Sequence, residues 1–254
     1  MRNLDEIRAV VTGGASGLGL ATATTIVKAG GKVALLDINQ TQGKESERDL
    51  GSAALFIQTD VSNESSVDSA IGKAASELGG INLAVSCAGI APSTRVLGRD
   101  GLMSTEDFAK VITINLNGCF SVARAAANVM QNNKADVDQQ RGVIINTASI
   151  AAFDGLIGQA AYSASKAGIV GMTLPLAREF ARIGVRVMTI APGLFRTPLF
   201  DTLPLKAVEA LEISTPFPSR LGDPAEFAAM VCHIFQNTML NGETIRLDGA
   251  LRMS

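Results

Sequence analysis

The sequence contains a single tyrosine, Tyr162, and a lysine, Lys166, follows it four residues later. In a helix this spacing places both side chains on one face, one turn apart. A free phenol loses its proton only at a pH of about 10. A neighbouring ammonium group favours the phenolate, so Lys166 is expected to make Tyr162 a better proton acceptor at neutral pH. Taken alone, however, a tyrosine–lysine pair on a helix is more often a surface contact.

Two further polar residues favour the catalytic interpretation. Ser149 lies just past a predicted strand over residues 143–147, where its hydroxyl could hold a substrate oxygen against Tyr162. The alternative is a turn serine that faces solvent. Asn115 lies inside a helical run, where asparagine is a mediocre helix former, and it could accept a proton or relay one through water toward Lys166.

A glycine-rich loop lies between the first predicted strand and a predicted helix, with the sequence Thr12-Gly13-Gly14-Ala15-Ser16-Gly17-Leu18-Gly19. Glycines allow a tight turn and let the backbone approach a pyrophosphate closely. The following helix directs its amide N–H groups and the positive end of its dipole at the phosphates. A lone glycine loop is weak evidence, but the strand before it and the helix after it favour a dinucleotide site over a plain turn.

The second predicted strand ends at Asp37, whose carboxylate could accept hydrogen bonds from the adenosine ribose. The same charge would repel the 2′-phosphate of NADP, and no basic residue follows at positions 38–40. We therefore predict NAD as the cofactor, although Asp37 could also cap a helix. Asp60 and Val61 follow the third predicted strand and could hold the adenine edge, or Asp60 could cap the next helix.

The elements that must position these residues alternate between short β-rich runs and helical patterns. The predicted strands are 9–12, 32–37, 54–59, 83–86, 143–147, 186–190 and 244–247, and the predicted helices are 17–29, 63–78, 105–131, 159–182 and 224–236. Near-continuous apolar strands separated by helices indicate a parallel sheet that is covered on both faces. We predict a single α/β domain over residues 1–254, a Rossmann-type doubly wound parallel sheet of about seven strands with helices on both faces.

Three stretches are longer than simple connections, namely residues 91–104, 132–141 and 194–219. In an open α/β sheet, long loops beyond the strand ends are where ligands bind. The last stretch carries apolar side chains at Phe195, Leu199, Phe200 and Leu203, which suggests a lid over an apolar substrate. The alternative is a helical element packed on the surface or at a subunit interface.

Composition excludes several classes of function. Hydrophobic residues make up 47% of the 254 residues, and 22 basic residues nearly balance 24 acidic ones. This balance gives no field that favours nucleic acid or an anionic membrane, and no stretch is apolar for the roughly 18 residues of a membrane span. Residues 1–10 lead into a strand without a signal or transit pattern, so we expect a cytoplasmic protein, with an organelle as the alternative.

Cysteine and histidine offer no metal site or hydrolase triad. The three cysteines, Cys87, Cys119 and Cys232, are odd in number and fit no zinc spacing, so we expect free thiols in a reducing compartment and no metal. The only histidine, His233, lies in an apolar helical run over residues 227–235. A structural histidine is expected there, and a histidine-based hydrolase has little support.

The set of Thr12-Gly13-x3-Gly17-x-Gly19, Asn115, Ser149 and Tyr162-x3-Lys166 resembles the short-chain dehydrogenase/reductase family over essentially the whole chain. The resemblance implies that Tyr162 is the acid/base, that Ser149 orients the substrate, that Lys166 binds the nicotinamide ribose, and that Asn115 supports a proton relay. It also implies that Pro192, Gly193, Phe195 and Thr197 lie at the nicotinamide carboxamide. The cofactor-binding residues are then Gly13, Ser16, Gly17, Leu18, Gly19, Asp37, Asp60, Val61, Cys87, Ala88, Gly89, Tyr162, Lys166, Pro192, Gly193, Phe195 and Thr197.

One position departs from the family pattern, which usually has Asn-Ala-Gly after the fourth strand. This chain has Cys87-Ala88-Gly89, and a thiol is only a weak hydrogen-bond partner. The polar contact that the asparagine normally supplies is therefore in doubt.

Longer segments look like one subgroup of the family, the type II 3-hydroxyacyl-CoA dehydrogenases, also called 17β-hydroxysteroid dehydrogenases of type 10. The matching segments are residues 87–91, 141–149, 158–166, 191–195, 216–222 and 241–250. The resemblance implies a homotetramer, an acyl-CoA as the small-molecule substrate, and Gln159 beside that substrate.

Together these observations predict NAD-dependent oxidation of an (S)-3-hydroxyacyl-CoA to the 3-oxoacyl-CoA, with Tyr162 as the proton acceptor. Two alternatives within the enzyme class are a hydroxysteroid dehydrogenase and a 3-oxoacyl-carrier-protein reductase. Asp37 argues against the reductase, because biosynthetic reductases mostly use NADP. A nucleotide-binding scaffold without catalysis is the alternative outside the class, and the intact Ser149, Tyr162 and Lys166 argue against it.

Overall fold

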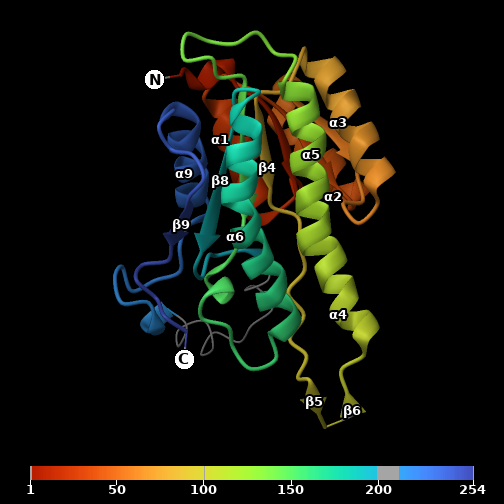
Figure 1. The fold of residues 1–254 in the computed structure, drawn as a ribbon, viewed down its shortest axis with the longest axis vertical. Coiled ribbons are helices and arrows are strands. Elements are labelled where there is room, and N and C mark those ends of the chain that lie inside the picture. The colour runs from red at the N-terminus through yellow and green to blue at the C-terminus, as the bar shows by residue number, and fades with distance from the viewer. Residues whose placement is uncertain (1, 100, 199–211, 254) are drawn as a thin grey trace.

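A fully parallel seven-stranded sheet forms the centre of the computed structural model, which describes residues 2–99, 101–198 and 212–253. Across the sheet the strands run in the order β3-β2-β1-β4-β7-β8-β9 (Figure 1). Their bounds are Arg8–Thr12 for β1, Lys32–Asp37 for β2, Ala54–Gln58 for β3, Leu83–Ser86 for β4, Gly142–Thr147 for β7, Val185–Pro192 for β8 and Thr244–Leu247 for β9. The predicted single-domain doubly wound sheet is confirmed.

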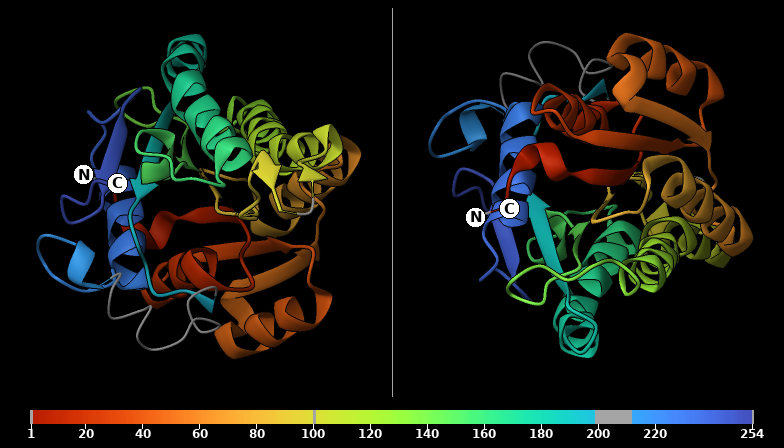
Figure 2. Two further views of the ribbon diagram at one scale, coloured as in Figure 1. Left: turned by 90° about the horizontal axis from the view of Figure 1, so that it is seen from below. Right: turned by 90° about the horizontal axis from the view of Figure 1, so that it is seen from above.

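Helices cover both faces of this sheet (Figure 2). One face carries α1 (Gly17–Lys28), α2 (Gln40–Leu50) and α9 (Pro224–Gln236), and the other carries α3 (Glu64–Leu78), α5 (Gly118–Met130) and α6 (Ala160–Ala181). Helix α4 (Thr105–Ile112) leads into α5 through a π-helical turn, η3 (Thr113–Asn117). Short 3-10 turns lie at η1 (Leu4–Glu6), η2 (Gly51–Ala53) and η4 (Ile150–Ala152).

The near-continuous apolar strands are buried from both sides, as the sequence pattern requires. Every residue of β4, β7 and β8 is buried. Their alternating side chains pack into hydrophobic clusters on both faces, of which the two largest lie under α3, α5 and α6 and under α1 and α9. Since both faces are filled, the strand ends and the loops beyond them are left to form a site.

Helix α2 was missed by the sequence pattern. Its sequence is polar almost throughout, and only Gly43 and Ser46 are buried, so no apolar periodicity marks it. The helix instead begins at a capping residue, because the side chain of Asn39 accepts a hydrogen bond from the backbone N–H of Gln42 at 3.1 Å.

Two other predictions needed correction. The helix predicted over 105–131 is interrupted, because the chain widens into the π-helical turn at Thr113–Asn117. The long connection over 91–104 contains a small antiparallel pair, β5 (Leu97–Gly98) and β6 (Gly101–Leu102). This hairpin projects from the lower end of the molecule in Figure 1.

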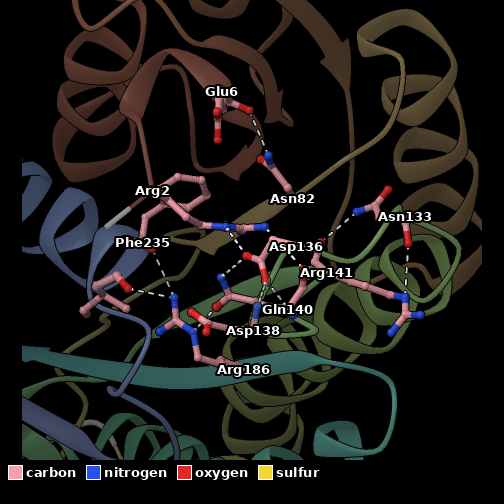
Figure 3. A network of polar contacts seen from close by, with 11 residues as sticks. Arg2, Glu6, Asn82, Asn133, Asp136, Asp138, Gln140, Arg141, Arg186 and Phe235 are labelled. Carbon is pink, nitrogen blue, oxygen red and sulfur yellow. Dashed lines mark hydrogen bonds and ion pairs between the residues drawn. The ribbon is translucent and has the colours of Figure 1, made fainter.

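A polar network ties down the opposite edge of the sheet, where the strands begin (Figure 3). Arg186 is buried and donates hydrogen bonds to the carbonyl oxygens of Ile234 and Phe235 at 2.9 and 3.2 Å. These carbonyls belong to the last turn of α9, so the guanidinium caps the carboxyl end of that helix. Burial lowers the pKa of Arg186 to about 10.

Cys87, Cys119 and Cys232 are free cysteines, and His233 lies on the exposed side of α9. No helix within residues 2–99, 101–198 and 212–253 is both long and apolar enough to span a membrane. Among the same residues, no group of three or more histidine, cysteine, aspartate or glutamate side chains could hold a metal ion.

Candidate active site

A cleft of about 510 Å³ lies at the carboxyl edge of the sheet, beside the glycine-rich loop. This volume falls within the range of small-molecule sites. Twelve of the residues predicted to bind a cofactor line it, namely Gly13, Ser16, Gly17, Leu18, Gly19, Asp37, Asp60, Val61, Cys87, Ala88, Gly89 and Thr197. The structure therefore brings together segments that lie far apart in the sequence.

Several positions of the glycine-rich loop have no room for a Cβ atom, and Gly13 and Gly19 show this most clearly. Gly13 has a φ of +63°, and a Cβ atom there would lie 2.9 Å from the backbone nitrogen of Ala88. A Cβ atom on Gly19 would lie 2.2 Å from the carbonyl oxygen of Gly13. The loop thus packs directly on the strand beside it and leads into α1, whose N-cap Ser16 makes no side-chain capping bond. The first-turn amides of α1 face a cleft that suits an anion.

Asp37 is held beside this loop at the end of β2. Its Oδ2 accepts a hydrogen bond from the backbone N–H of Ala15 at 3.1 Å, and its Oδ1 accepts one from Asn39 at 3.0 Å. Asp60 uses its Oδ1 to accept hydrogen bonds from both the N–H and the hydroxyl of Ser62. Both carboxylates line the cleft, and neither is a helix cap, because α2 and α3 are capped by Asn39 and Asn63.

Cys87 contacts Thr147 where the family usually has asparagine. Its Sγ lies 3.5 Å from the Thr147 hydroxyl oxygen. Burial raises the pKa of the Cys87 thiol to about 11, so the group stays protonated at neutral pH. Next to it, the N–H of Ala88 donates to the Thr12 hydroxyl at 3.2 Å, which joins this segment to the start of the glycine-rich loop.

Lys166 and Tyr162 lie one turn apart on α6, as their spacing predicts. The Lys166 Nζ atom lies 5.7 Å from the centre of the Tyr162 ring. The lysine is only 5% exposed, and its Nζ donates a hydrogen bond to the Thr147 carbonyl at 2.7 Å. A buried ammonium group that is fixed by a backbone oxygen is not a surface contact, so the alternative explanation of the tyrosine–lysine pair is excluded.

The side chain of Asn115 is fully engaged in a positioning role. Its Oδ1 accepts from the N–H of Ile90 at 2.8 Å, and its Nδ2 donates to the Ile90 carbonyl and to the Ser165 hydroxyl. Ser165 in turn donates to the Tyr162 carbonyl at 2.7 Å. The residue lies in the π-helical turn η3, and such turns are frequent at functional sites. This chain of bonds connects the segment after β4 to the turn that carries Tyr162.

Ser149 lies just past the end of β7, partly exposed, at the carboxyl edge of the sheet. Its Oγ accepts a hydrogen bond from the N–H of Ala151 at 3.1 Å, so the hydroxyl hydrogen remains available to a ligand. Gln159 lies at the start of α6, and its side-chain oxygen accepts from the N–H of Leu156 at 3.4 Å. Both residues border the segment that links β7 to α6.

Five of the predicted cofactor-binding residues are not among those that line the cleft, namely Tyr162 and Lys166 on α6, and Pro192, Gly193 and Phe195 at and after the end of β8. The side chain of Phe195 is 6% exposed and packs in the core that includes Phe227 and Val231 of α9. Pro192 ends β8, and the N–H of Gly193 donates to the Leu247 carbonyl at 2.9 Å. Pro192, Gly193 and Phe195 therefore shape the turn after β8, and contact with a ligand would come from their backbone.

Several site residues were not found from the sequence. Leu36, Ile38, Thr59, Ile90, Ile114 and Pro198 also line the cleft. Thr147 acts through its carbonyl oxygen, which no side-chain pattern reveals. Ser165 was open to detection, because it lies between Tyr162 and Lys166 on the same helix.

The chain is similar to known proteins over nearly its whole length. The family model described as short chain dehydrogenase matches residues 8–207. The human protein 3-hydroxyacyl-CoA dehydrogenase type-2 is 52% identical over 254 residues, which cover 99% of this chain and 97% of that protein. The ipsdienol dehydrogenase of Ips pini is 34% identical over 246 residues, which cover 96% of each.

A solved structure agrees with these sequence relatives. The crystal structure of 3-hydroxyacyl-CoA dehydrogenase type-2 from Mycobacterium avium superimposes with a TM-score of 0.91 at 40% identity. The match covers 97% of this chain and 96% of that one. The likeness therefore extends over the sheet, its helices and the segments that surround the cleft.

Proposed function

Because the chain belongs to the short-chain dehydrogenase family and is an oxidoreductase, we propose that it oxidises the hydroxyl of an (S)-3-hydroxyacyl-CoA with NAD. The observation that carries the proposal is the buried Lys166 ammonium group, fixed by the Thr147 carbonyl and held 5.7 Å from the Tyr162 ring. A nucleotide-binding scaffold has no need of this arrangement. This arrangement of Lys166 and Tyr162 therefore favours catalysis over nucleotide binding alone.

The cleft suits a dinucleotide. Gly13, Gly17 and Gly19 line the cleft without side chains, so a pyrophosphate could approach the backbone at the start of α1, as its binding requires. Asp37 lines the far end, where it would accept hydrogen bonds from the ribose of the adenosine. Ile38 follows it and is exposed, so a neutral side chain stands where NADP would need a cation. These features support NAD rather than NADP.

The residues of this chain divide the reaction between them. Bound NAD would supply the acceptor for the substrate hydride. Tyr162, in its deprotonated form, takes the proton of the substrate hydroxyl at its phenolic oxygen, and the positive charge of Lys166 lies one helical turn away. Ser149 donates a hydrogen bond to the substrate oxygen as it becomes a carbonyl. Asn115 holds the Ile90 backbone and the Ser165 hydroxyl, and these contacts keep the turn that carries Tyr162 in place.

An acyl-CoA substrate is supported by the relatives. The proteins from human and Mycobacterium avium are both called 3-hydroxyacyl-CoA dehydrogenase type-2. The hydroxysteroid and 3-oxoacyl-carrier-protein alternatives use the same residues, so the substrate has to be decided by turnover. The ipsdienol dehydrogenase, which is 34% identical, is named for a different alcohol. Family membership alone therefore does not decide the substrate.

One predicted member of the proposed lid over residues 194–219 has to be corrected, because Phe195 is buried and is not free to cover a substrate. Phe195 belongs to the core, and a Cβ atom on Gly222 would lie 2.7 Å from its ring, so Phe195 serves as the fixed base of any lid. Leu199, Phe200 and Leu203 lie outside the described residues. Ile213 and Phe217 at the far end are exposed and remain candidates to contact an acyl chain.

We also propose a homotetramer in a reducing compartment such as the cytoplasm. Three neighbouring helices on one side of the sheet expose large apolar side chains, Phe108 on α4, Phe120 on α5 and Leu174 on α6, and burial of such side chains between copies would be favourable. The three free cysteines fit reducing conditions.

The test is turnover across a panel of substrates with NAD and with NADP. We expect NADH formation from 3-hydroxyacyl-CoAs with a kcat/KM well above that for hydroxysteroids, and little turnover with NADP. A higher kcat/KM for a hydroxysteroid would show that the proposed substrate class is wrong. A preference for NADP would contradict the proposed role of Asp37. Absence of turnover with every alcohol, together with tight NADH binding, would favour the scaffold.

A further inference from the structure

The C-terminal segment, residues 244–252, touches three separate parts of the candidate site. The N–H of Gly193, in the turn after β8, donates to the Leu247 carbonyl at 2.9 Å. The N–H of Phe217, at the end of the 194–219 stretch, donates to the Gly249 carbonyl at 3.2 Å. In Figure 1 the C-terminus lies below β9, at the end of the molecule toward which the parallel strands point. Residues 244–252 therefore contact the segments that follow β8, at the same end of the sheet as the candidate site.

Arg246 makes the third and strongest of these contacts. Its Nη2 donates to Asp154 Oδ2 at 2.6 Å and its Nε to Asp248 Oδ2 at 2.7 Å. Its guanidinium carbon also lies 5.1 Å from the centre of the Phe153 ring. The Arg246 side chain is 21% exposed, and those of Asp154 and Asp248 are 19% and 7% exposed. Charge-assisted bonds in such a partly buried cluster are more constraining than an exposed ion pair.

Asp154 belongs to the segment that begins at Ser149. Between them the chain forms the 3-10 turn η4, in which the N–H groups of Phe153 and Asp154 both donate to the Ile150 carbonyl at 2.9 Å. Ser149 itself accepts from Ala151 within the same turn. These bonds couple the two ends of the turn, so the anchoring of Asp154 restrains the segment that carries the Ser149 hydroxyl. The hydrogen bond from Arg246 also lowers the pKa of Asp154.

Asp248 connects the same guanidinium to the turn after β8. A Cβ atom on Gly193 would lie 2.9 Å from the Asp248 Cα atom, so the two backbones are in direct contact. The planar fork of an arginine can hold two carboxylates at a fixed separation, which a lysine cannot do as well. Arg246 therefore joins the Ser149 turn to the Gly193 turn through a single rigid group.

We propose that Arg246 is a positioning residue, whose guanidinium holds the Ser149 turn in register with the Gly193 turn and so sets the substrate oxygen against Tyr162. The proposal rests on the proposed function, because it gives Arg246 a role in that reaction. It assigns no contact with the substrate to Arg246. A small displacement of a substrate-orienting group can lower turnover by about 100-fold, so loss of this link should be visible in kinetics.

The experiment compares Arg246→Met, Arg246→Lys and Asp154→Asn with a matched control, Arg124→Met. Arg124 also binds two carboxylates, Glu64 at 3.0 Å and Asp68 at 2.7 Å, but these lie between α5 and α3, away from the site. The measurements are kcat and KM for the best secondary alcohol of the wild-type protein, the Kd of NADH and the Tm. Asp154→Asn is the milder change and serves if Arg246→Met does not fold.

We expect Arg246→Met to lower kcat/KM by about 10- to 100-fold while the Kd of NADH stays within about twofold. Arg246→Lys should lie between this variant and the wild type. The double variant of Arg246→Met and Asp154→Asn should be little worse than Arg246→Met alone, because both changes break one link. Arg124→Met should keep wild-type kinetics.

A purely structural clasp would lower the Tm and leave kcat and KM unchanged, which would overturn the proposal. A loss of kcat/KM in Arg124→Met as large as that in Arg246→Met would overturn it as well. If the wild type oxidises no alcohol, the proposed function fails. The restraint that Arg246 places on the Ser149 turn can still be measured by amide hydrogen exchange. Faster exchange of the Phe153 and Asp154 amides in Arg246→Met would support the link, and unchanged exchange would contradict it.

Discussion

At the scale of single residues, the site depends on side chains whose polar atoms are held by backbone groups. Lys166 is fixed by the Thr147 carbonyl, Asn115 by both backbone groups of Ile90, and Asp37 by the N–H groups of Ala15 and Asn39. Backbone partners do not change rotamer, so the geometry exists before a ligand arrives. The residues were predictable from their types and spacing, but these partners were not.

The charge of Asp37 gives a prediction about cofactor choice. Asp37→Asn keeps an oxygen for the Ala15 N–H and removes the charge that would repel a 2′-phosphate. We expect the ratio of kcat/KM for NADP to that for NAD to rise by about tenfold, equivalent to about 1.4 kcal/mol. Asp60→Asn is the matched control, because it removes a carboxylate from the same cleft. Equal effects of the two changes would contradict the special role of Asp37.

At the scale of elements, the glycine-rich loop and the helix caps decide where each functional segment begins. Helix α9 begins at a capping box, in which the Asp223 side chain accepts from the backbone and Glu226 accepts from the Asp223 N–H at 2.8 Å. Helix α2 begins at Asn39 without any apolar stripe. Local polar bonds therefore position elements that hydrophobic patterning does not mark.

Two alanine substitutions, one in the glycine-rich loop and one in α3, should have opposite effects on stability. Gly19→Ala would place its Cβ atom 2.2 Å from the Gly13 carbonyl oxygen, so we expect about 2 kcal/mol or more of lost stability and weak NADH binding. Gly72→Ala lies within α3, and no atom would lie within 4 Å of its Cβ. It should gain about 0.5–1 kcal/mol from helix propensity. Urea unfolding and NADH titration of both variants test this contrast, and a stable, NADH-binding Gly19→Ala variant would refute the steric argument.

The capping box of α9 predicts a pH dependence of stability. Hydrogen bonds from Arg220 and from the Asp223 backbone lower the pKa of Glu226 from 4.5 to about 2. A carboxyl group with a lowered pKa in the folded state stabilises the protein above its unfolded pKa, and the contribution disappears as the pH falls through the folded value. Since these side chains are nearly half exposed, we expect Glu226→Gln to cost under about 1 kcal/mol at neutral pH.

Urea unfolding of the wild type and of Glu226→Gln at several pH values would measure this difference. The gap between the two proteins should be full above a pH of about 4.5 and should close toward a pH of about 2. A gap that is independent of pH would show that the ion pair contributes nothing through its charge.

The elements also show what the sequence could predict and what it could not. The strands were predictable because the parallel sheet buries them from both sides, which leaves apolar runs such as Val143–Ile145 in the sequence. The hairpin β5–β6 was not, since its strands are exposed and only two residues long each. The π-helical turn at Asn115 was only hinted at by a poor helix former, because its geometry depends on the tertiary bonds to Ile90 and Ser165.

At the scale of the whole molecule, the amino ends of the strands are held by a structural network, whereas the carboxyl ends form the candidate site. The far edge is tied by Arg186 and its neighbours (Figure 3), which cap α9 and join loops without lining the cleft. The carboxyl edge carries the glycine-rich loop, Asp37, Ser149 and the end of β8. This division is general for open parallel sheets, whose ligands lie beyond the strand ends.

The exposed apolar side chains on α4, α5 and α6 lead to a prediction about assembly. Sedimentation should give the mass of four chains of 26.4 kDa each. Phe120→Glu should shift the mass toward smaller species, because burying an unpaired charge between subunits is costly. Val137→Glu is the control, since Val137 is 96% exposed on a loop at the other edge. A wild-type monomer would contradict the proposed tetramer.

The central claim is that Tyr162 transfers the proton while the cleft binds NAD, and one comparison tests it most directly. Steady-state NADH formation from a 3-hydroxyacyl-CoA is measured for the wild type and for Tyr162→Phe, alongside the Kd of NADH for each. Loss of a catalytic acid/base should reduce kcat by about 100-fold or more and leave NADH binding nearly unchanged. A Tyr162→Phe variant that retains wild-type turnover would contradict the proposed role of the tyrosine.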